Sequence, residues 1–181
     1  MQNGIAARSQ AVAVNYASKR MSEWKSSYNL KGLPMFERRM VAGWGDMDFN
    51  SHMANTSFLD KASDIRMLFL NEHGYPMGEF KRLNIGPVVM KDDIAYFKEV
   101  TLLENITVTL AVAGLSQDGS RWMLRSDIYR SDGKLAARIN STGGWLDLTA
   151  RKLVTPPPSL LAAWQSLYQT DDFQELPSSV R

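Results

Sequence analysis

A single long amphipathic segment, flanked by stretches typical of β-strands, limits the folds open to this chain. From Asn55 onward, apolar residues recur at helical spacing on one side and polar residues occupy the other. The apolar positions are Phe58, Leu59, Ala62, Ile65, Phe69 and Leu70. Gly74, with Pro76 two residues later, predicts the end of this helix. Residues 34–44 have no helical period and predict a strand before it.

Strand-like segments follow the helix, after a stretch at residues 75–84 that we expect to be a loop. Asp118-Gly119 and Asp132-Gly133 are turn signals, so the segments around them predict an antiparallel meander. The strand-like segments are residues 85–100, 105–115, 122–129 and 135–148. A sheet of this length buries one helix only by wrapping around it, which predicts an α+β domain. Such a sheet leaves open edges, so we expect a dimer.

The ends of the chain are predicted to be extensions of a central domain at residues 34–158. Residues 1–33 carry an apolar stripe at helical spacing, which predicts a helical extension. The stripe consists of Val14, Ala17, Met21, Trp24 and Tyr28. The alternative is an organelle transit peptide, because residues 1–22 hold basic residues and no acid. Residues 159–181 predict a short helix and a polar tail, expected to be mobile from Thr170 onward.

Composition excludes several classes of function. The formal net charge of +2 is too small to indicate a nucleic-acid partner. Cysteine is absent, which excludes disulfides and thiolate chemistry, and only two histidines are present, so we expect no metal site. No apolar run approaches the roughly 20 residues that span a bilayer, and no nucleotide-binding loop suggests a cofactor. We therefore expect a soluble, cytoplasmic protein without a cofactor.

Residues 46–59 carry the strongest indication of chemistry. They begin Asp46-Met47-Asp48-Phe49-Asn50-Ser51-His52 and run directly into the helical pattern. Polar, proton-transferring side chains therefore precede a helix N-terminus, where free N–H groups and the helix dipole favour developing negative charge. Acyl transfer needs this combination of a base and an oxyanion site. The structural alternative is an Asx-rich loop that caps a helix.

This stretch resembles the active-site signature of hot-dog-fold acyl thioesterases. In the 4-hydroxybenzoyl-CoA thioesterase-like group, Gly-Asp-x-Asp is followed by His, Asn and an aromatic residue at the head of the central helix. The plant acyl-ACP thioesterases carry a similar Asp-x-Asn-x-His-x-x-Asn, matched here by Asp48, Asn50, His52 and Asn55. The resemblance implies a hot-dog fold, with an antiparallel sheet wrapped around a central helix. It also implies a metal-free homodimer or homotetramer that hydrolyses acyl-CoA or acyl-carrier-protein thioesters in lipid metabolism.

The resemblance also implies roles for individual residues. Asp48 matches the catalytic acid and would act as general base or as nucleophile, while His52 would donate a hydrogen bond to the thioester oxygen or the thiolate. Asn50 and Asn55 would orient water or brace the loop, although Ala54 departs from the usual Asn-Asn pair and leaves the role of Asn55 open. Asp46 is expected to fix the loop.

Two further residues and two rival functions complete the expectations. Lys81 and Arg82 would contact a CoA phosphate, or else form a solvated surface pair. One rival is a hot-dog enoyl-CoA hydratase, whose motif Asp-x-Asn-Pro-x-His has a proline and one more residue between Asp and His than this chain has. The other rival is a non-catalytic acyl-CoA-binding protein of the same fold.

Overall fold

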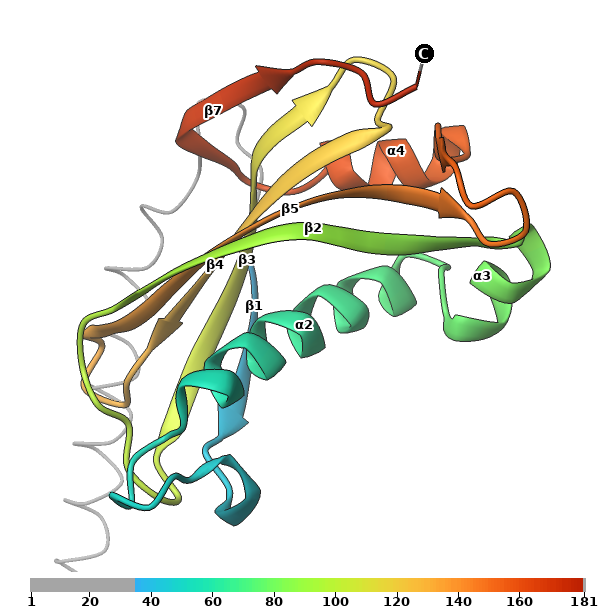
Figure 1. Ribbon diagram of the computed structural model, residues 1–181. Helices are drawn as coiled ribbons and strands as arrows, with labels where there is room; N and C mark the ends of the chain where they lie inside the picture. The colour runs from blue at the N-terminus through green and yellow to red at the C-terminus, as the bar shows by residue number, and fades with distance from the viewer. Residues whose placement is uncertain (1–34, 181) are drawn as a thin grey trace, which may run out of the picture.

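The computed structural model describes residues 35–180, which form a seven-stranded sheet and the helices that pack on it (Figure 1). The predicted N-terminal extension and its transit-peptide alternative lie outside the described residues. In chain order the elements are β1 (Phe36–Val41), the 3-10 helix η1 (Trp44–Asp46), α2 (Asn55–Glu72), α3 (Met77–Leu83), β2 (Ile85–Tyr96), β3 (Asn105–Ser116), β4 (Arg121–Tyr129), β5 (Leu135–Asp147), β6 (Leu153–Val154), α4 (Pro158–Gln165) and β7 (Gln169–Leu176).

The sheet has the strand order β1-β3-β4-β5-β2 and curves around α2 (Figure 1). β1 and β2, which flank α2 in the sequence, therefore lie at opposite edges. All of these pairings are antiparallel, and the β3–β4–β5 meander is the predicted one. Outside this path, β6 pairs with β5, and β7 runs parallel to β3. The predicted α+β architecture is confirmed.

The central helix α2 has the predicted start and end. Its buried face includes Phe58, Ala62, Ile65 and Phe69, which pack on the sheet. Gly74 follows the helix with a φ of +86°, a conformation that glycine adopts without steric cost. The apolar period in the sequence is therefore the cause of both the helix and its position.

Three buried indoles fill the core between the sheet and α4. The rings of Trp145 and Trp164 stack with centroids 5.8 Å apart, and the Trp122 ring meets both of them edge-on. Gly143 makes this packing possible, because a Cβ atom there would lie 2.3 Å from the Trp122 ring and from the Val88 carbonyl oxygen. The predicted C-terminal helix is confirmed as α4, and it closes this end of the core.

Two sequence-based predictions are wrong. Residues 75–84 were expected to be a loop but contain α3, whose Phe80 is buried in the core. Seven residues are too few to show a helical period, so the apolar pattern does not reveal this helix. The polar tail was expected to be mobile from Thr170, yet residues 169–176 form β7. Its partner β3 lies far away in the sequence, and local composition does not report such a pairing.

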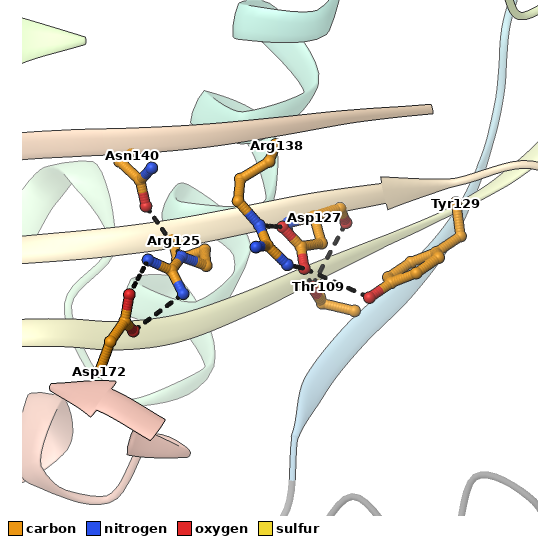
Figure 2. Close-up of polar contacts among 7 residues, drawn as sticks. All are labelled: Thr109, Arg125, Asp127, Tyr129, Arg138, Asn140 and Asp172. Carbon is orange, nitrogen blue, oxygen red and sulfur yellow. Dashed lines mark hydrogen bonds and ion pairs between the residues drawn. The ribbon is translucent and has the colours of Figure 1, made fainter. Parts of the chain in front are cut away.

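Polar contacts on the outer face of the sheet help to hold β7 (Figure 2). Arg125 of β4 donates two hydrogen bonds to the Asp172 carboxylate, at 2.9 and 2.8 Å, and a third to Asn140 of β5. These bonds from Arg125 lower the pKa of Asp172 to about 2. Nearby, Arg138 forms a similar two-bond pair with Asp127. The outer face is therefore a polar surface that anchors a strand.

Candidate active site

The residues that precede α2 form a compact loop, called here the signature loop (residues 46–55). Asp46 fixes its start. Its Oδ2 atom accepts a hydrogen bond from the Gly43 N–H at 2.7 Å and lies 2.9 Å from the Lys61 ammonium nitrogen on α2. The side chains of Asp46 and Lys61 are each only 16% exposed, so the ion pair is largely shielded from water. The beginning of the loop is thereby attached to the second turn of the helix.

Asp48 lies at the centre of the signature loop and uses one carboxylate oxygen to hold it. Oδ1 accepts hydrogen bonds from the N–H groups of Asn50 (2.7 Å) and His52 (3.2 Å), while the Asp48 N–H donates to the His52 carbonyl oxygen. Between them, Ser51 adopts a φ of +62°. Within the described residues the second oxygen, Oδ2, has no hydrogen-bond partner. Asp48 therefore makes the Asx turn of the structural alternative and still presents a free carboxylate oxygen.

The backbone amides at the start of α2 are mostly occupied. The N–H groups of His52, Met53 and Ala54 donate to Asp48, Val100 and Asp46 respectively. Ala54, and not Asn55, is the N-cap residue, and it has no side-chain oxygen with which to cap the helix.

Asn55 is the first residue of the helix, and its Oδ1 accepts the Thr56 N–H at 2.9 Å. Among the described contacts, the Asn55 N–H alone of the amides at residues 52–56 has no acceptor. It is therefore the donor at this helix terminus that remains available to a ligand.

The other predicted residues of the motif lie in the same loop. The His52 Nε2 atom is 3.4 Å from a Glu99 carboxylate oxygen, and the His52 backbone forms an isolated bridge with Thr101. Asn50 is exposed, and its side chain makes no hydrogen bond within the described residues. The structure thus brings Asp48, Asn50, His52 and Asn55 together at one end of α2.

Sequence reasoning missed two residues near this end of the helix. The Tyr96 hydroxyl donates to the Asn55 carbonyl oxygen at 3.2 Å and its ring packs edge-on against Phe58. Glu99, in the segment after β2, faces His52. Both residues reach the signature loop because β2 returns alongside α2, and no local pattern around Tyr96 or Glu99 marks them.

Lys81 and Arg82 are not brought to the signature loop of their own chain. They lie in α3, at the opposite end of α2 (Figure 1). By the 1.5 Å rise per residue, the 18-residue helix separates the two ends by about 27 Å. Arg82 also donates two hydrogen bonds to Glu79, at 2.9 and 2.7 Å, which leaves Lys81 as the less engaged cation.

A cleft of about 570 Å³ runs along the β1 side of α2. It is lined by Met40, Lys61, Asp64, Met67, Leu68, Asn71, Tyr75, Pro76 and Met77. Met67 and Met77 line this cleft, whereas Phe69 and Phe80 are buried in the core. Lys61 contributes to the cleft and to the signature loop, but Asp48 does not line the cleft.

Two further features concern the described residues only. Between residues 35 and 180, the His, Asp and Glu side chains form no group of three that could hold a metal ion. In the same range every helix is too short or too polar to cross a membrane.

Comparison with known structures supports the fold. A Staphylococcus aureus protein, SAV2348, solved in complex with CoA, is 21% identical, with a TM-score of 0.69 over 82% of this chain and 92% of that one. Slr0204, a 1,4-dihydroxy-2-naphthoyl-CoA thioesterase from Synechocystis, is 15% identical, with a TM-score of 0.66 over 72% and 96%. YbaW, a probable thioesterase from Escherichia coli, is 19% identical, with a TM-score of 0.62 over 73% and 98%.

Among curated protein sequences there is no significant match. The sequence profile of the thioesterase-like superfamily, however, matches residues 42–164, which include the signature loop, α2 and the whole meander. The predicted hot-dog architecture is thereby confirmed, and the chain belongs to the thioesterase-like superfamily.

Proposed function

We propose that this protein hydrolyses an acyl-CoA thioester, with Asp48 as the catalytic carboxylate and the Asn55 N–H as an oxyanion donor. The observation that carries the proposal is that a carboxylate oxygen and a backbone N–H, both without hydrogen-bond partners among the described residues, lie at the same helix terminus. Among the described residues, Asp48 has one oxygen without a partner and Asn55 has an amide without an acceptor. The amides of His52, Met53 and Ala54 are all hydrogen bonded. A base beside a donor for developing negative charge is what acyl transfer requires.

The chemistry can proceed by either of two routes from Asp48. As a general base, its carboxylate takes a proton from water while the water oxygen attacks the thioester carbonyl carbon. The carbonyl oxygen becomes an oxyanion that accepts the Asn55 N–H, and the positive end of the α2 dipole stabilises it. When the tetrahedral intermediate collapses, the C–S bond breaks and the thiolate takes the proton back from Asp48.

As a nucleophile, the Asp48 carboxylate would attack the same carbon, the C–S bond would break to release the thiolate, and water would then hydrolyse the resulting mixed anhydride. Single turnover in ¹⁸O-labelled water separates the routes, because only the anhydride route can transfer an unlabelled Asp48 oxygen to the first product. The remaining side chains then have supporting roles. His52 would donate to the thioester oxygen or the departing thiolate, and Asn50 would orient the attacking water.

CoA is favoured as the thiol carrier by likeness to other proteins. The S. aureus relative was solved with CoA, and Slr0204 is named as a CoA thioesterase. Lys81 is our candidate for a phosphate contact, since Arg82 is engaged with Glu79. If Lys81 meets CoA, Lys81→Ala will raise KM for acyl-CoA and leave kcat unchanged, and it will not alter turnover of short pantetheine thioesters.

We also propose that the active unit is a homodimer joined at β2. This strand is twelve residues long and, among the described strands, pairs only with β5; it exposes Val89, Met90 and Tyr96. A long unpaired edge with apolar side chains is a template for a second strand. A second copy at this edge would approach the Tyr96–Asn55 contact and so bring its own residues close to the signature loop.

The direct test is release of free thiol from a panel of short, long and aromatic acyl-CoAs, run with wild type and Asp48→Asn. Loss of the carboxylate is expected to lower kcat by about 10²–10⁴. Arg39→Gln, a change on the exposed surface of β1, is the control and should leave turnover unchanged. Near-normal turnover by Asp48→Asn would remove Asp48 from the mechanism. A folded wild-type protein that releases thiol from no CoA substrate would contradict the proposed activity.

A further inference from the structure

Arg66 is a buried cation that the proposed mechanism does not use. It lies in the middle of α2 and is only 8% exposed. Its Nη2 donates one hydrogen bond to the neutral Ser63 hydroxyl at 3.2 Å, and no carboxylate among the described residues lies within ion-pair distance of it. Burial lowers the pKa of Arg66 from its usual value. Arginine is almost never buried without a charged partner, because removing the charge from water is costly.

The surroundings of Arg66 hold a second buried donor that lacks an acceptor. Its guanidinium carbon lies 5.6 Å from the centroid of the Trp122 ring on β4. The indole N–H of Trp122 is also buried and has no acceptor within the described residues. Asp92 of β2, the acid whose charge acts on Arg66, accepts the Ser141 hydroxyl at 2.6 Å and lies outside ion-pair distance of Arg66. Two buried donor groups therefore lie in one region with unused hydrogen-bonding capacity.

Arg66 and the signature loop lie along the same stretch of α2 and β2. The hydrogen bond to Ser63 shows that the guanidinium leans towards the N-terminus of the helix, and Ser63 is eight residues from Asn55, or about 12 Å along the axis. On β2, Asp92 precedes Tyr96 by four residues on the same face, or about 13 Å. Tyr96 contacts Asn55, and the charge of Asp92 acts on Arg66. Both distances, about 12 Å along α2 and about 13 Å along β2, match the length of a medium-length acyl chain. Such a chain would reach from a thioester at the signature loop to Arg66.

We propose that Arg66 binds a carboxylate at the far end of the acyl group, so that the preferred substrates are ω-carboxyacyl thioesters of medium length. This inference rests on the proposed thioesterase function. A carboxylate offers two oxygens to the planar guanidinium and neutralises the buried charge, which a methyl terminus cannot do. The cleft on the β1 side of α2 offers no such group, since its lysine, Lys61, is already paired with Asp46.

The test compares three substrates that differ only at the chain end: suberyl-CoA, its ω-methyl ester and octanoyl-CoA. For wild type, kcat/KM is expected to be at least tenfold higher for suberyl-CoA than for the two neutral substrates. Arg66→Met is expected to lower kcat/KM for suberyl-CoA about ten- to hundredfold, which is the usual effect of losing a hydrogen bond to a charged group. Turnover of octanoyl-CoA should fall far less, and Arg66→Lys should restore part of the preference.

Asp92→Asn separates ligand binding from a structural pairing of Arg66 with Asp92. If Arg66 binds the substrate, removal of the nearby negative charge will lower KM for suberyl-CoA. If Arg66 serves only to balance Asp92, both Arg66→Met and Asp92→Asn will lower stability and reduce turnover of all three substrates equally, which would overturn the proposal. Arg39→Met is the matched control, because it makes the same chemical change at an exposed position on β1.

The chain-end preference of wild type also decides between this inference and the proposed function. Equal hydrolysis of suberyl-CoA and octanoyl-CoA would overturn the role of Arg66 and leave the thioesterase intact. Release of thiol from none of the substrates would overturn both. Free suberate provides a readout without turnover, since it should raise the Tm of wild type and not of Arg66→Met, whereas octanoate should have the same effect on both proteins.

Discussion

At the scale of single residues, Asp48 combines a structural and a chemical task in one side chain. Its Oδ1 holds two loop amides, and an asparagine at this position can accept the same two hydrogen bonds through its own Oδ1. We expect Asp48→Asn to keep wild-type stability, and Asp48→Ala to lower the free energy of unfolding by about 1–2 kcal/mol through the loss of two exposed hydrogen bonds. Urea unfolding of the three proteins measures this. Equal stability of the alanine variant would mean that the Asx turn contributes nothing.

The Asp46–Lys61 ion pair is the second residue-scale feature with a measurable effect. Because both side chains are mostly shielded, Lys61→Met leaves a partly buried carboxylate whose one remaining partner among residues 35–180 is the Gly43 N–H. We expect a loss of about 1–3 kcal/mol in the free energy of unfolding, together with lower kcat, since the signature loop loses its attachment to α2. Lys91→Met is the control: its pair with Asp93 is exposed and 3.9 Å long, so stability should change by less than about 0.5 kcal/mol. Similar losses in the two variants would contradict the argument.

At the scale of elements, β7 should respond to acid because of its contact with Arg125. Hydrogen bonds from Arg125 hold the pKa of folded Asp172 at about 2, below its value of 3.8 in the absence of such contacts. The stabilisation is therefore complete above about pH 4 and is lost as the pH falls through 2. We expect the urea midpoint of wild type to fall over this window more steeply than that of Asp172→Asn. Parallel pH profiles would show that the pair does not stabilise the fold.

Two glycine positions test the packing of neighbouring elements with the same chemical change. Gly143→Ala would place a methyl group 2.3 Å from the Trp122 ring and the Val88 oxygen, and we expect it to cost about 2–3 kcal/mol or to prevent folding. In α3, Gly78 has open space around its Cα, so Gly78→Ala should stabilise the protein by about 0.5–1 kcal/mol. Thermal unfolding of both variants is sufficient. If Gly143→Ala had the same thermal stability as wild type, the core would have to rearrange around the added methyl group.

The sequence predicted the elements that have a local signal. The apolar period from Phe58 to Leu70 located α2, and the two Asp-Gly turns located the meander. Helix α3 is too short for a period, and β7 depends on a distant partner, so both were missed. The candidate site also has features with a local sequence signal and features that depend on distant contacts. The motif located Asp48 and its neighbours, but which amide stays free depends on contacts of Val100 and Asp46 that only the fold reveals.

At the scale of the whole molecule, the proposed dimer depends on β2. A lysine near a free edge opposes pairing with a second strand, and Val89 is partly exposed there. We expect Val89→Lys to raise the dimer dissociation constant at least tenfold and to lower thiol release at low protein concentration. Sedimentation velocity and activity, followed over the same dilution series, measure this. Leu68→Lys, at a similarly exposed site on the other side of α2, is the control. A wild-type monomer with full activity would contradict the dimer proposal.

The edge of the sheet opposite β2 is formed by two strands, β1 and β7, that run in different directions. There, β1 runs antiparallel to one half of β3, and β7 runs parallel to the other half. A strand arriving from another molecule could be antiparallel to one of them only by being parallel to the other. Continuous growth into a fibre needs two unlike edges that fit each other along their whole length. Within the described residues β2 finds no such counterpart on the far edge, so sheet-to-sheet addition would end with one partner instead of propagating into a filament.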